Sequence, residues 1–159
     1  MSERFSTAGM YLAYAAESTA GTRPTGANAY TKIPEVKSIP SFNPAPETIE
    51  STTLSETEYK TYVKGLKDVG GALEFNANMT DDLDTAWSTL LTAFETAVAA
   101  SKKVWFVIGH PHLAKATYFT GDPSSIGLNE ASVGGMAETT LYITPTGSPV
   151  RESAPTWST

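Results

Sequence analysis

Two histidines flank a proline at His110-Pro111-His112, and they are the side chains in this sequence best suited to metal binding. A zinc site needs at least a third protein ligand, together with groups that orient the imidazoles. The 159-residue chain contains no cysteine, and no acidic residue is adjacent to the histidines. The intervening proline favours a turn. We therefore expect His110 and His112 to form a short turn that binds no metal.

Three aspartates lie close together at Asp81, Asp82 and Asp84 and could in principle bind a cation. An EF-hand loop needs oxygen ligands at alternate positions and a glycine at its turn, and this run has neither. The aspartates instead precede an apolar pattern typical of a helix. Negative charge there complements the positive end of the helix dipole. Helix capping therefore explains these residues better than a metal site does.

Motifs that carry enzymatic chemistry are absent from the sequence. There is no G-x-S-x-G, no P-loop and no dinucleotide fingerprint. A paired-carboxylate hydrolase stays open at this point, because the fold assembles such pairs from distant residues. We predict that the protein is not an enzyme and uses no cofactor.

Charge and composition exclude several classes of partner. The formal net charge of −6 argues against nucleic-acid binding, which depends on Lys and Arg neutralising phosphates. No apolar run approaches the roughly 20 residues that span a bilayer, and the amino terminus lacks the features of a secretory signal. We expect a soluble protein made in the cytosol, with residues 1–159 forming a single domain and no membrane association.

One amphipathic helix is the clearest predicted element, spanning about residues 81–101 within the segment Thr80–Lys103. Thr80 or Asp81 can cap its amino end, and Lys102 and Lys103 carry positive charge near its carboxyl end. Apolar residues recur at three- and four-residue steps, namely Leu83, Trp87, Leu90, Leu91, Phe94 and Val98. We expect this stripe to pack on a sheet.

Six segments are predicted to be strands, although the first also fits a short helix: Gly9–Ala16, Tyr30–Ile39, Gly70–Met79, Val104–Gly109, Leu113–Thr120 and Met136–Thr144. Pro34 fits an edge or a bulge better than a central strand. Val104–Gly109 is apolar on both faces and indicates a buried central strand. The pattern predicts a mainly β protein, a sandwich or barrel-like fold with one flanking helix. A flexible arm (1–8) and a flexible tail (145–159) are expected at the termini.

The segment 40–69 shows no periodicity and is predicted to be a long loop. A structureless loop of this length is uncommon inside a compact domain and is usually either functional or disordered. Its apolar and aromatic residues, Tyr59, Tyr62, Val63 and Leu66, favour a function over a solvated linker. We interpret them as anchors for other copies of the chain.

The residues from Thr52 to Phe75 (TTLSETEYKTYVKGLKDVGGALEF) resemble the major tail tube protein of long-tailed bacteriophages. The resemblance depends on Thr52-Thr53, Tyr59, Tyr62 and the Gly65-Leu66-Lys67-Asp68 turn, followed by an alternating strand and a helix. It extends over about residues 9–144. The same fold is similar to the tube proteins of contractile tails and of type VI secretion.

This resemblance implies a structural virion protein that is synthesised in the host cytoplasm. Six copies would form a ring, and stacked rings would form a tube through which DNA passes without specific binding. The implied partners are the tape measure protein, the tail terminator and distal tail or baseplate proteins. The inter-subunit interface would include Thr52, Thr53, Tyr59, Tyr62, Val63 and Leu66.

Alternating strands also provide candidates for the lumen of such a tube. The polar faces of Gly70–Met79 and Met136–Thr144 carry Glu74, Asn76, Asn78, Glu138 and Thr140. We expect some of these to line the lumen and to repel phosphate weakly. The alternative hypothesis is a monomeric β-sandwich binding module that stacks sugars on surface aromatic residues, with Trp105, Tyr118 and Tyr142 as candidates.

Overall fold

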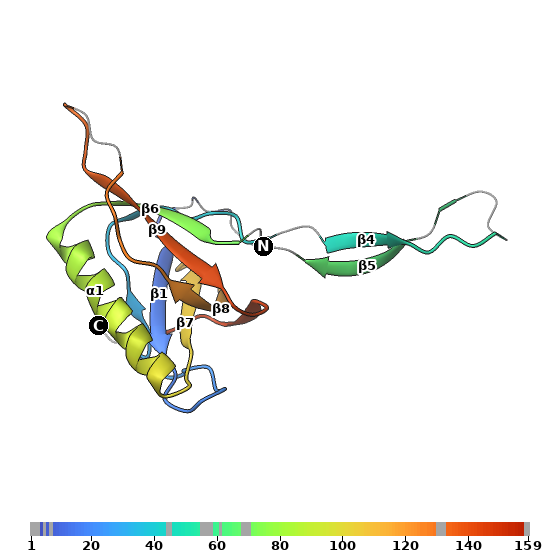
Figure 1. Cartoon of the computed structure of the whole chain (residues 1–159), viewed down its shortest axis with the longest axis horizontal. Helices are drawn as coiled ribbons and strands as arrows, with labels where there is room; N and C mark the ends of the chain where they lie inside the picture. The colour runs from blue at the N-terminus through green and yellow to red at the C-terminus, as the bar shows by residue number, and fades with distance from the viewer. Residues whose placement is uncertain are drawn as a thin grey trace.

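The computed structural model describes residues 4, 6, 8–43, 46–54, 59–60, 62–67, 71–129 and 133–157. Within these residues the chain forms one curled β-sheet, one helix packed against it and a separate two-stranded hairpin that projects to one side (Figure 1). The predicted mainly β, barrel-like fold with a flanking helix is confirmed.

The elements follow one another in this order: β1 (Tyr11–Ala16), β2 (Thr31–Lys32), β3 (Val36–Ser38), β4 (Pro46–Glu50), β5 (Tyr62–Lys67), β6 (Leu73–Asn78), α1 (Asp81–Ala99), β7 (Val104–Gly109), β8 (Lys115–Pro123), β9 (Glu138–Pro145) and β10 (Val150–Ser153). The large sheet has the strand order β2-β1-β7-β8-β9-β6-β3, with β10 paired to β8. We call this sheet together with α1 the body.

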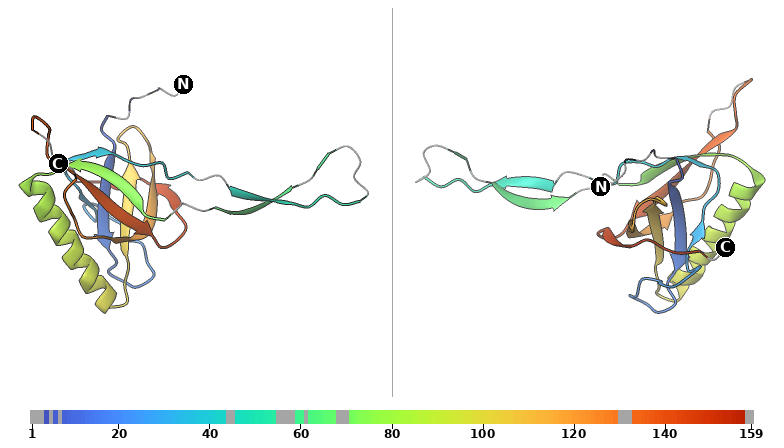
Figure 2. Two further views of the ribbon diagram at one scale, coloured as in Figure 1. Left: turned by 45° about the horizontal axis from the view of Figure 1, so that its top comes forward. Right: turned by 180° about the vertical axis from the view of Figure 1, so that it is seen from behind.

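A short connection forces the sheet to curl. β2 and β3 lie at the two ends of the strand order, yet only residues 33–35 separate them in sequence. Three residues span at most about 12 Å, whereas neighbouring strands alone are about 4.8 Å apart. The two ends of the sheet must therefore approach each other, which gives the half-barrel visible in Figure 2.

The concave face of the half-barrel contains the main core. Inward residues of the strands, among them Phe75, Phe106 and Phe119, pack with Leu83, Trp87 and Leu90 of α1. Most of the predicted helical stripe is therefore confirmed. Val98 is wrong, because it is exposed and the neighbouring Ala97 is buried instead.

The helix begins and ends by identifiable local interactions. The Thr80 side chain accepts a hydrogen bond from the Leu83 amide at 3.2 Å, which confirms the predicted cap. The helix ends at Ala99, two residues before the predicted end. Ser101 there adopts a left-handed conformation with φ of 59°, and the Lys102 amide bonds back to the Ala97 carbonyl at 2.7 Å.

A second, smaller core lies on the convex face of β1, β7 and β8. It contains Val107 and Tyr118 and is covered by the segment around Tyr30 and by the C-terminal residues Ala154 and Trp157. The Trp157 Nε1 group donates a hydrogen bond to the Tyr30 carbonyl at 2.5 Å. This explains why Val104–Gly109 is apolar on both faces, as predicted for a central strand.

Three segments differ from the sequence prediction. Tyr30–Ile39 is not one strand but two, because Pro34 and Glu35 form a turn in which Glu35 has a φ of 66°. Residues 145–159, expected to be a flexible tail, contain β10 and the packed Trp157. The long segment 40–69 contains the paired strands β4 and β5. Of the expected arm 1–8, only residues 4, 6 and 8 are described, and they are exposed.

Candidate functional site

The β4–β5 hairpin is the most prominent surface feature of the molecule (Figures 1 and 2). β4 and β5 pair antiparallel, with Ile49 opposite Val63 and Glu50 opposite Tyr62, and in the described part of the chain neither strand joins the large sheet. An isolated two-stranded hairpin is at best marginally stable in water. The hairpin therefore lacks the layer of packing that stabilises the body.

Apolar side chains of the hairpin are displayed to solvent. Tyr59 is 81% exposed and Tyr62 is 57% exposed, and Ile49 and Leu54 are exposed as well. Large aromatic side chains on a protruding element are typical of protein interfaces. The hairpin thus exposes large apolar side chains that belong to neither core of the body.

The six predicted interface residues are all placed on this hairpin. Thr53 is exposed and Thr52 is half-buried, both just after β4. Tyr62, Val63 and Leu66 belong to β5, and Tyr59 precedes it. Residues 55–58, 61 and 68–70 of the same segment lie outside the described residues. The structure thus brings together, on one element, residues that the sequence analysis treated as parts of a loop.

The predicted lumen residues also share one surface. β6 and β9 pair so that Asn76 faces Thr140 and Asn78 faces Glu138, with Glu74 in line on the same side. The opposite side of the same strands, with Leu73, Phe75, Ala77, Leu141 and Ile143, is buried in the core. We call the side that carries Glu74, Asn76, Asn78, Glu138 and Thr140 the polar face.

Hydrogen bonds connect the polar face into a network. The Thr140 hydroxyl donates to Asn76 Oδ1 at 3.2 Å, and Asn129 Nδ2 donates to the Thr140 hydroxyl at 3.0 Å. Lys37 on β3 forms an ion pair with Glu138. Because Lys37 offsets one of the two carboxylates, the face combines uncharged polar groups with a small excess of negative charge.

The histidine pair has a structural role. His110 is buried, and the His112 amide donates to its Nδ1 at 3.1 Å. Nε2 therefore carries the proton and donates to the Ala8 carbonyl at 2.8 Å. Both ring nitrogens are engaged, and the predicted turn at Pro111-His112 is confirmed. Among the described residues, no cluster of three or more potential ligands could hold a metal ion.

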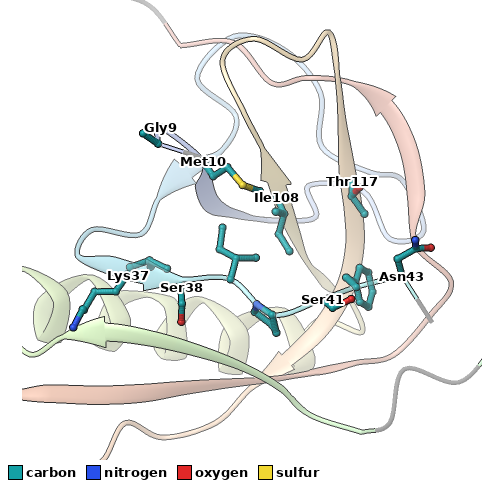
Figure 3. Close-up of a pocket in the computed structure, with 13 residues that line it drawn as sticks. Gly9, Met10, Lys37, Ser38, Ser41, Asn43, Ile108 and Thr117 are labelled. Atoms are coloured by element: carbon teal, nitrogen blue, oxygen red, sulfur yellow. The ribbon is translucent and has the colours of Figure 1, made fainter. Parts of the chain in front are cut away.

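An open groove lies between the N-terminal end of β1 and the chain that leaves β3 (Figure 3). Its volume is about 940 Å³, and its described lining includes Met10, Lys37, Phe42, Asn43 and Ile108. Lys37 is the only ionisable side chain among those lining residues, and its amine is paired with Glu138. The groove therefore shows no pair of groups suited to acid–base catalysis.

Glu17 is a buried carboxylate that the sequence analysis did not single out. Its Oε1 accepts hydrogen bonds from the amides of Lys103 (2.8 Å) and Gly21 (3.3 Å), and its Oε2 accepts one from Trp105 Nε1 (3.0 Å). Burial raises the pKa of Glu17, but the hydrogen bonds outweigh burial and hold the pKa below its usual range. No local pattern reveals this role, because two of the three donors, Lys103 and Trp105, lie far away in the sequence. Glu17 fastens the end of β1 to the start of β7.

The aromatic residues proposed for sugar stacking do not form a platform. Tyr118 is only 1% exposed, and its hydroxyl donates to the Ser153 carbonyl at 2.6 Å. Trp105 is half-buried on the convex face, and its Nε1 group donates a hydrogen bond to Glu17. Tyr142 lies on β9 within the polar face, opposite Glu74, and belongs to a different strand pair from the other two. Tyr118 was therefore a wrong prediction for a surface aromatic.

Among the described residues, no helix is both long and apolar enough to cross a membrane.

Comparison with known proteins gives likenesses at the level of structure. No protein-family model matches the chain, and no curated protein sequence matches it. A chain in the sixfold-symmetrised structure of the anti-feeding prophage baseplate has a TM-score of 0.61 and 10% identity, covering 96% of this chain and 98% of that chain. A chain in the sheath-tube complex of the PVC extracellular contractile injection system has a TM-score of 0.52 and 10% identity, covering 90% of this chain and 88% of that chain. The protein therefore shares its fold with components of prophage and contractile injection particles.

Proposed function

We propose that this protein is a structural subunit of a phage-type tail tube, in which six copies form a ring and the rings stack. The observation that carries the proposal is the β4–β5 hairpin, which projects from the body and exposes Tyr59 and Tyr62. A second copy supplies the packing partner that the hairpin lacks within its own chain. Heterologous contacts of this kind close into rings or continue as filaments.

The energetics of the hairpin support assembly. Ordering a residue costs about 1–2 kcal/mol of backbone entropy, and the exposed side chains recover little of it in the free subunit. Burying apolar area against another copy contributes about 25 cal/mol per Å². The hairpin is therefore expected to become fixed on assembly, with Tyr59 and Tyr62 as anchors together with Val63 and Leu66.

The similar structures support the same function. One belongs to a baseplate structure with sixfold symmetry, and the other to a sheath-tube complex. Both matches extend over most of the two chains compared, so the likeness concerns the whole body. By analogy, the partners of this chain include a tape measure protein, a tail terminator and distal tail or baseplate proteins, and its location is the virion.

The polar face supports a role as the wall of a channel. Glu74, Asn76, Asn78, Glu138 and Thr140 present hydrogen-bonding groups and carboxylates, and among these five residues there is no cation to hold a phosphate. DNA that passes along such a wall meets weak repulsion and no binding site. We therefore assign the polar face to the lumen.

The test compares the unsubstituted protein with the double variant Tyr59→Ser/Tyr62→Ser. Sedimentation velocity and negative-stain microscopy of concentrated protein are expected to show rings or tubes for the first and folded monomers for the second. Hydrogen exchange is expected to show amides of β4 and β5 exchanging rapidly in the monomer and slowly in the tube.

Tyr142→Ser is the matched control, because it removes another exposed tyrosine from outside the hairpin. It is expected to assemble as the unsubstituted protein does. Equal hydrogen-exchange protection of the hairpin in monomer and tube, or long tubes formed by the double variant, would contradict the proposal.

A further inference from the structure

The groove between the N-terminal end of β1 and the chain that leaves β3 is an apolar opening in the surface of the body. Its lining includes Met10, Ile39, Phe42 and Ile108 (Figure 3). Ile39 and Phe42 pack against the main core and are half-buried, and Met10 is 39% exposed. With a volume of about 940 Å³, the groove lies in the size range of sites that enclose a whole small ligand. It therefore has room for a large side chain from another molecule.

Two cations lie beside this groove. Arg151 on β10 donates a hydrogen bond from Nη1 to the hydroxyl of Thr117, a lining residue, at 3.3 Å. Lys115 is two residues before Thr117 on β8, so it lies on the same side of the strand. Both cations are exposed, and neither forms an ion pair with a described residue. The rim of the groove therefore carries positive charge that the described part of the chain does not neutralise.

The acidic residues closest in sequence to this rim do not cancel its charge. Glu152 lies opposite Ala116, which belongs to the second core on the convex face, so Glu152 is directed to the other side of β10. Residues 1–7, which precede the lining of the groove, contain one acid and one base, Glu3 and Arg4. Their side chains therefore add no net charge to the rim.

The distal end of the β4–β5 hairpin has the complementary character. Glu50 lies directly opposite Tyr62, so the two side chains share one face of the hairpin, and both are exposed. Lys64 lies on the same face, opposite Thr48, but nearer to the body. From Glu50 to Tyr62 the sequence contains three glutamates and one lysine, which gives a net charge of −2. An aromatic ring beside a carboxylate thus matches an apolar groove beside a guanidinium.

The hairpin cannot place this face in the groove of its own chain. Pro46 pairs with Lys67 at the near end of the hairpin, and Glu50 pairs with Tyr62 at the distal end, four residues further along β4. Four residues of a strand span about 13 Å, and the hairpin projects away from the body (Figures 1 and 2). A hairpin that enters the groove must therefore come from another copy.

We infer that the groove receives the distal end of the β4–β5 hairpin of a second copy of this chain. Tyr62 of one copy enters the groove of the next, and Glu50 pairs with Arg151 at the rim. The inference rests on the proposed function, because it names the surface on which the hairpin docks. Since the hairpin and the groove are different surfaces of one molecule, the contact is heterologous and can repeat around a ring or along a filament.

Charge reversal tests the pairing of Glu50 with Arg151. Arg151→Glu is expected to lower the assembled fraction roughly tenfold or more, because it brings two carboxylates together in the contact. Its monomer is expected to stay folded, because Arg151 is exposed on β10. The double variant Arg151→Glu/Glu50→Arg restores a pair of opposite charges between copies and is expected to recover assembly. Sedimentation velocity measures the assembled fraction.

The matched control is Arg151→Glu/Glu95→Arg, which has the same net charge but places the new arginine on α1, where Glu95 is exposed. It is expected to assemble as poorly as Arg151→Glu does. An equimolar mixture of Arg151→Glu and Glu50→Arg is expected to assemble, although neither variant does so alone. In the mixture, each hairpin finds a groove of opposite charge on the other variant.

Methionine oxidation tests the apolar part of the contact. Peroxide converts accessible methionine to its sulfoxide, and Met10 lines the groove. Mass spectrometry is expected to show that Met10 oxidises several-fold more slowly in the assembled unsubstituted protein than in Arg151→Glu monomers. An added methionine-containing peptide calibrates the dose of peroxide.

Three outcomes would overturn the inference: assembly of Arg151→Glu at the unsubstituted level, equal assembly of the two double variants, or equal oxidation of Met10 in monomer and assembly. In each of them the unsubstituted protein still assembles, so the proposed function stands. If the unsubstituted protein forms no assembly at all, the proposed function fails together with this inference.

Discussion

The body and the β4–β5 hairpin are both antiparallel β structure, but they differ in where their apolar side chains lie. In the body, Phe75, Phe106 and Phe119 are completely buried beneath α1. In the hairpin, Tyr59 and Tyr62 are exposed. The same type of backbone pairing is thus stabilised by packing in one region and lacks that packing in the other. Folding stability and assembly are therefore expected to depend on separate parts of the chain.

The largest effect on stability is expected from the core. Leu90→Ala removes a completely buried side chain of α1 and is expected to lower the free energy of unfolding by about 2–5 kcal/mol. Replacing the hairpin (residues 44–70) by a flexible linker is expected to leave the unfolding midpoint of the monomer nearly unchanged. Urea denaturation of the monomers measures both quantities.

Ser88→Ala is the control for the helix, because Ser88 is exposed two residues before Leu90. It is expected to change the free energy of unfolding by less than about 0.5 kcal/mol. A large loss of monomer stability on hairpin removal would show that the two regions are coupled, and the comparison would then fail.

A smaller effect is expected from Glu17. Glu17→Gln replaces one carboxylate oxygen by an amide NH₂ group, which cannot accept a hydrogen bond. Buried N–H donors among those of Trp105, Lys103 and Gly21 are then left unpaired. The cost is about 1–3 kcal/mol. The variant tests whether the body depends on this buried carboxylate as well as on apolar packing.

The pH dependence of the Glu17 contribution follows from the direction of its pKa shift. The folded-state pKa is lowered, so the stabilisation is present at neutral pH. This stabilisation is lost as the pH falls below 4.5, the ordinary pKa of a glutamate side chain, and then through the lowered pKa of Glu17 in the folded state. Urea unfolding of the two proteins at pH 7 and at pH 3 is expected to give a difference that narrows in acid. A constant difference would mean that Glu17 acts through its shape and not its charge.

The smallest effect on stability is expected from the polar face. Glu74→Lys/Glu138→Lys removes a surface ion pair with Lys37, which is worth about 0–1 kcal/mol. Monomer stability and tube formation are expected to change little. Release of DNA from particles that carry the variant is expected to slow, because the channel wall gains cations that attract phosphate.

The matched control for the polar face is Glu95→Lys, which reverses one exposed charge on α1 instead. It is expected to leave DNA release unchanged. Unchanged release by the double variant, or a tube structure with Glu74 and Glu138 on the outer wall, would refute the lumen assignment.

The sequence predicted the elements of the body well because each periodic pattern has one physical cause, the burial of one face of a strand or a helix. Alternation in Gly70–Met79 predicted the strand and separated its polar from its apolar face, and the structure buries the apolar one; β9 shows the same agreement. The helical stripe correctly identified Leu83, Trp87 and Leu90. The stripe failed at Val98, which lies in the last turn of the helix and is exposed. The chain changes direction at Ser101, two residues after the helix ends.

The hairpin and β10 were missed because their strands carry no such period. β4 (PETIE) begins with proline, β5 (YVKGLK) contains glycine, and β10 (VRES) is exposed along its length. Their pairing is decided by a partner strand that no local pattern identifies. For the candidate site, the sequence supplied the residues of the hairpin and the polar face, but not the buried carboxylate of Glu17.

The pairing of β1 with β7 has a consequence for how the chain folds. Tyr11 lies opposite Gly109 and Ala16 opposite Val104. The first strand of the body, β1, therefore cannot pair until β7 has been synthesised, much later in the chain. Contacts between residues so distant in sequence slow folding, because the entropy of closing the loop precedes any gain from packing. The β4–β5 hairpin, in contrast, needs only local pairing and leaves the ribosome well before β7. If the hairpin is the assembly element, as proposed, a nascent chain presents it before the body exists, and rapid completion of the body becomes a condition for orderly assembly.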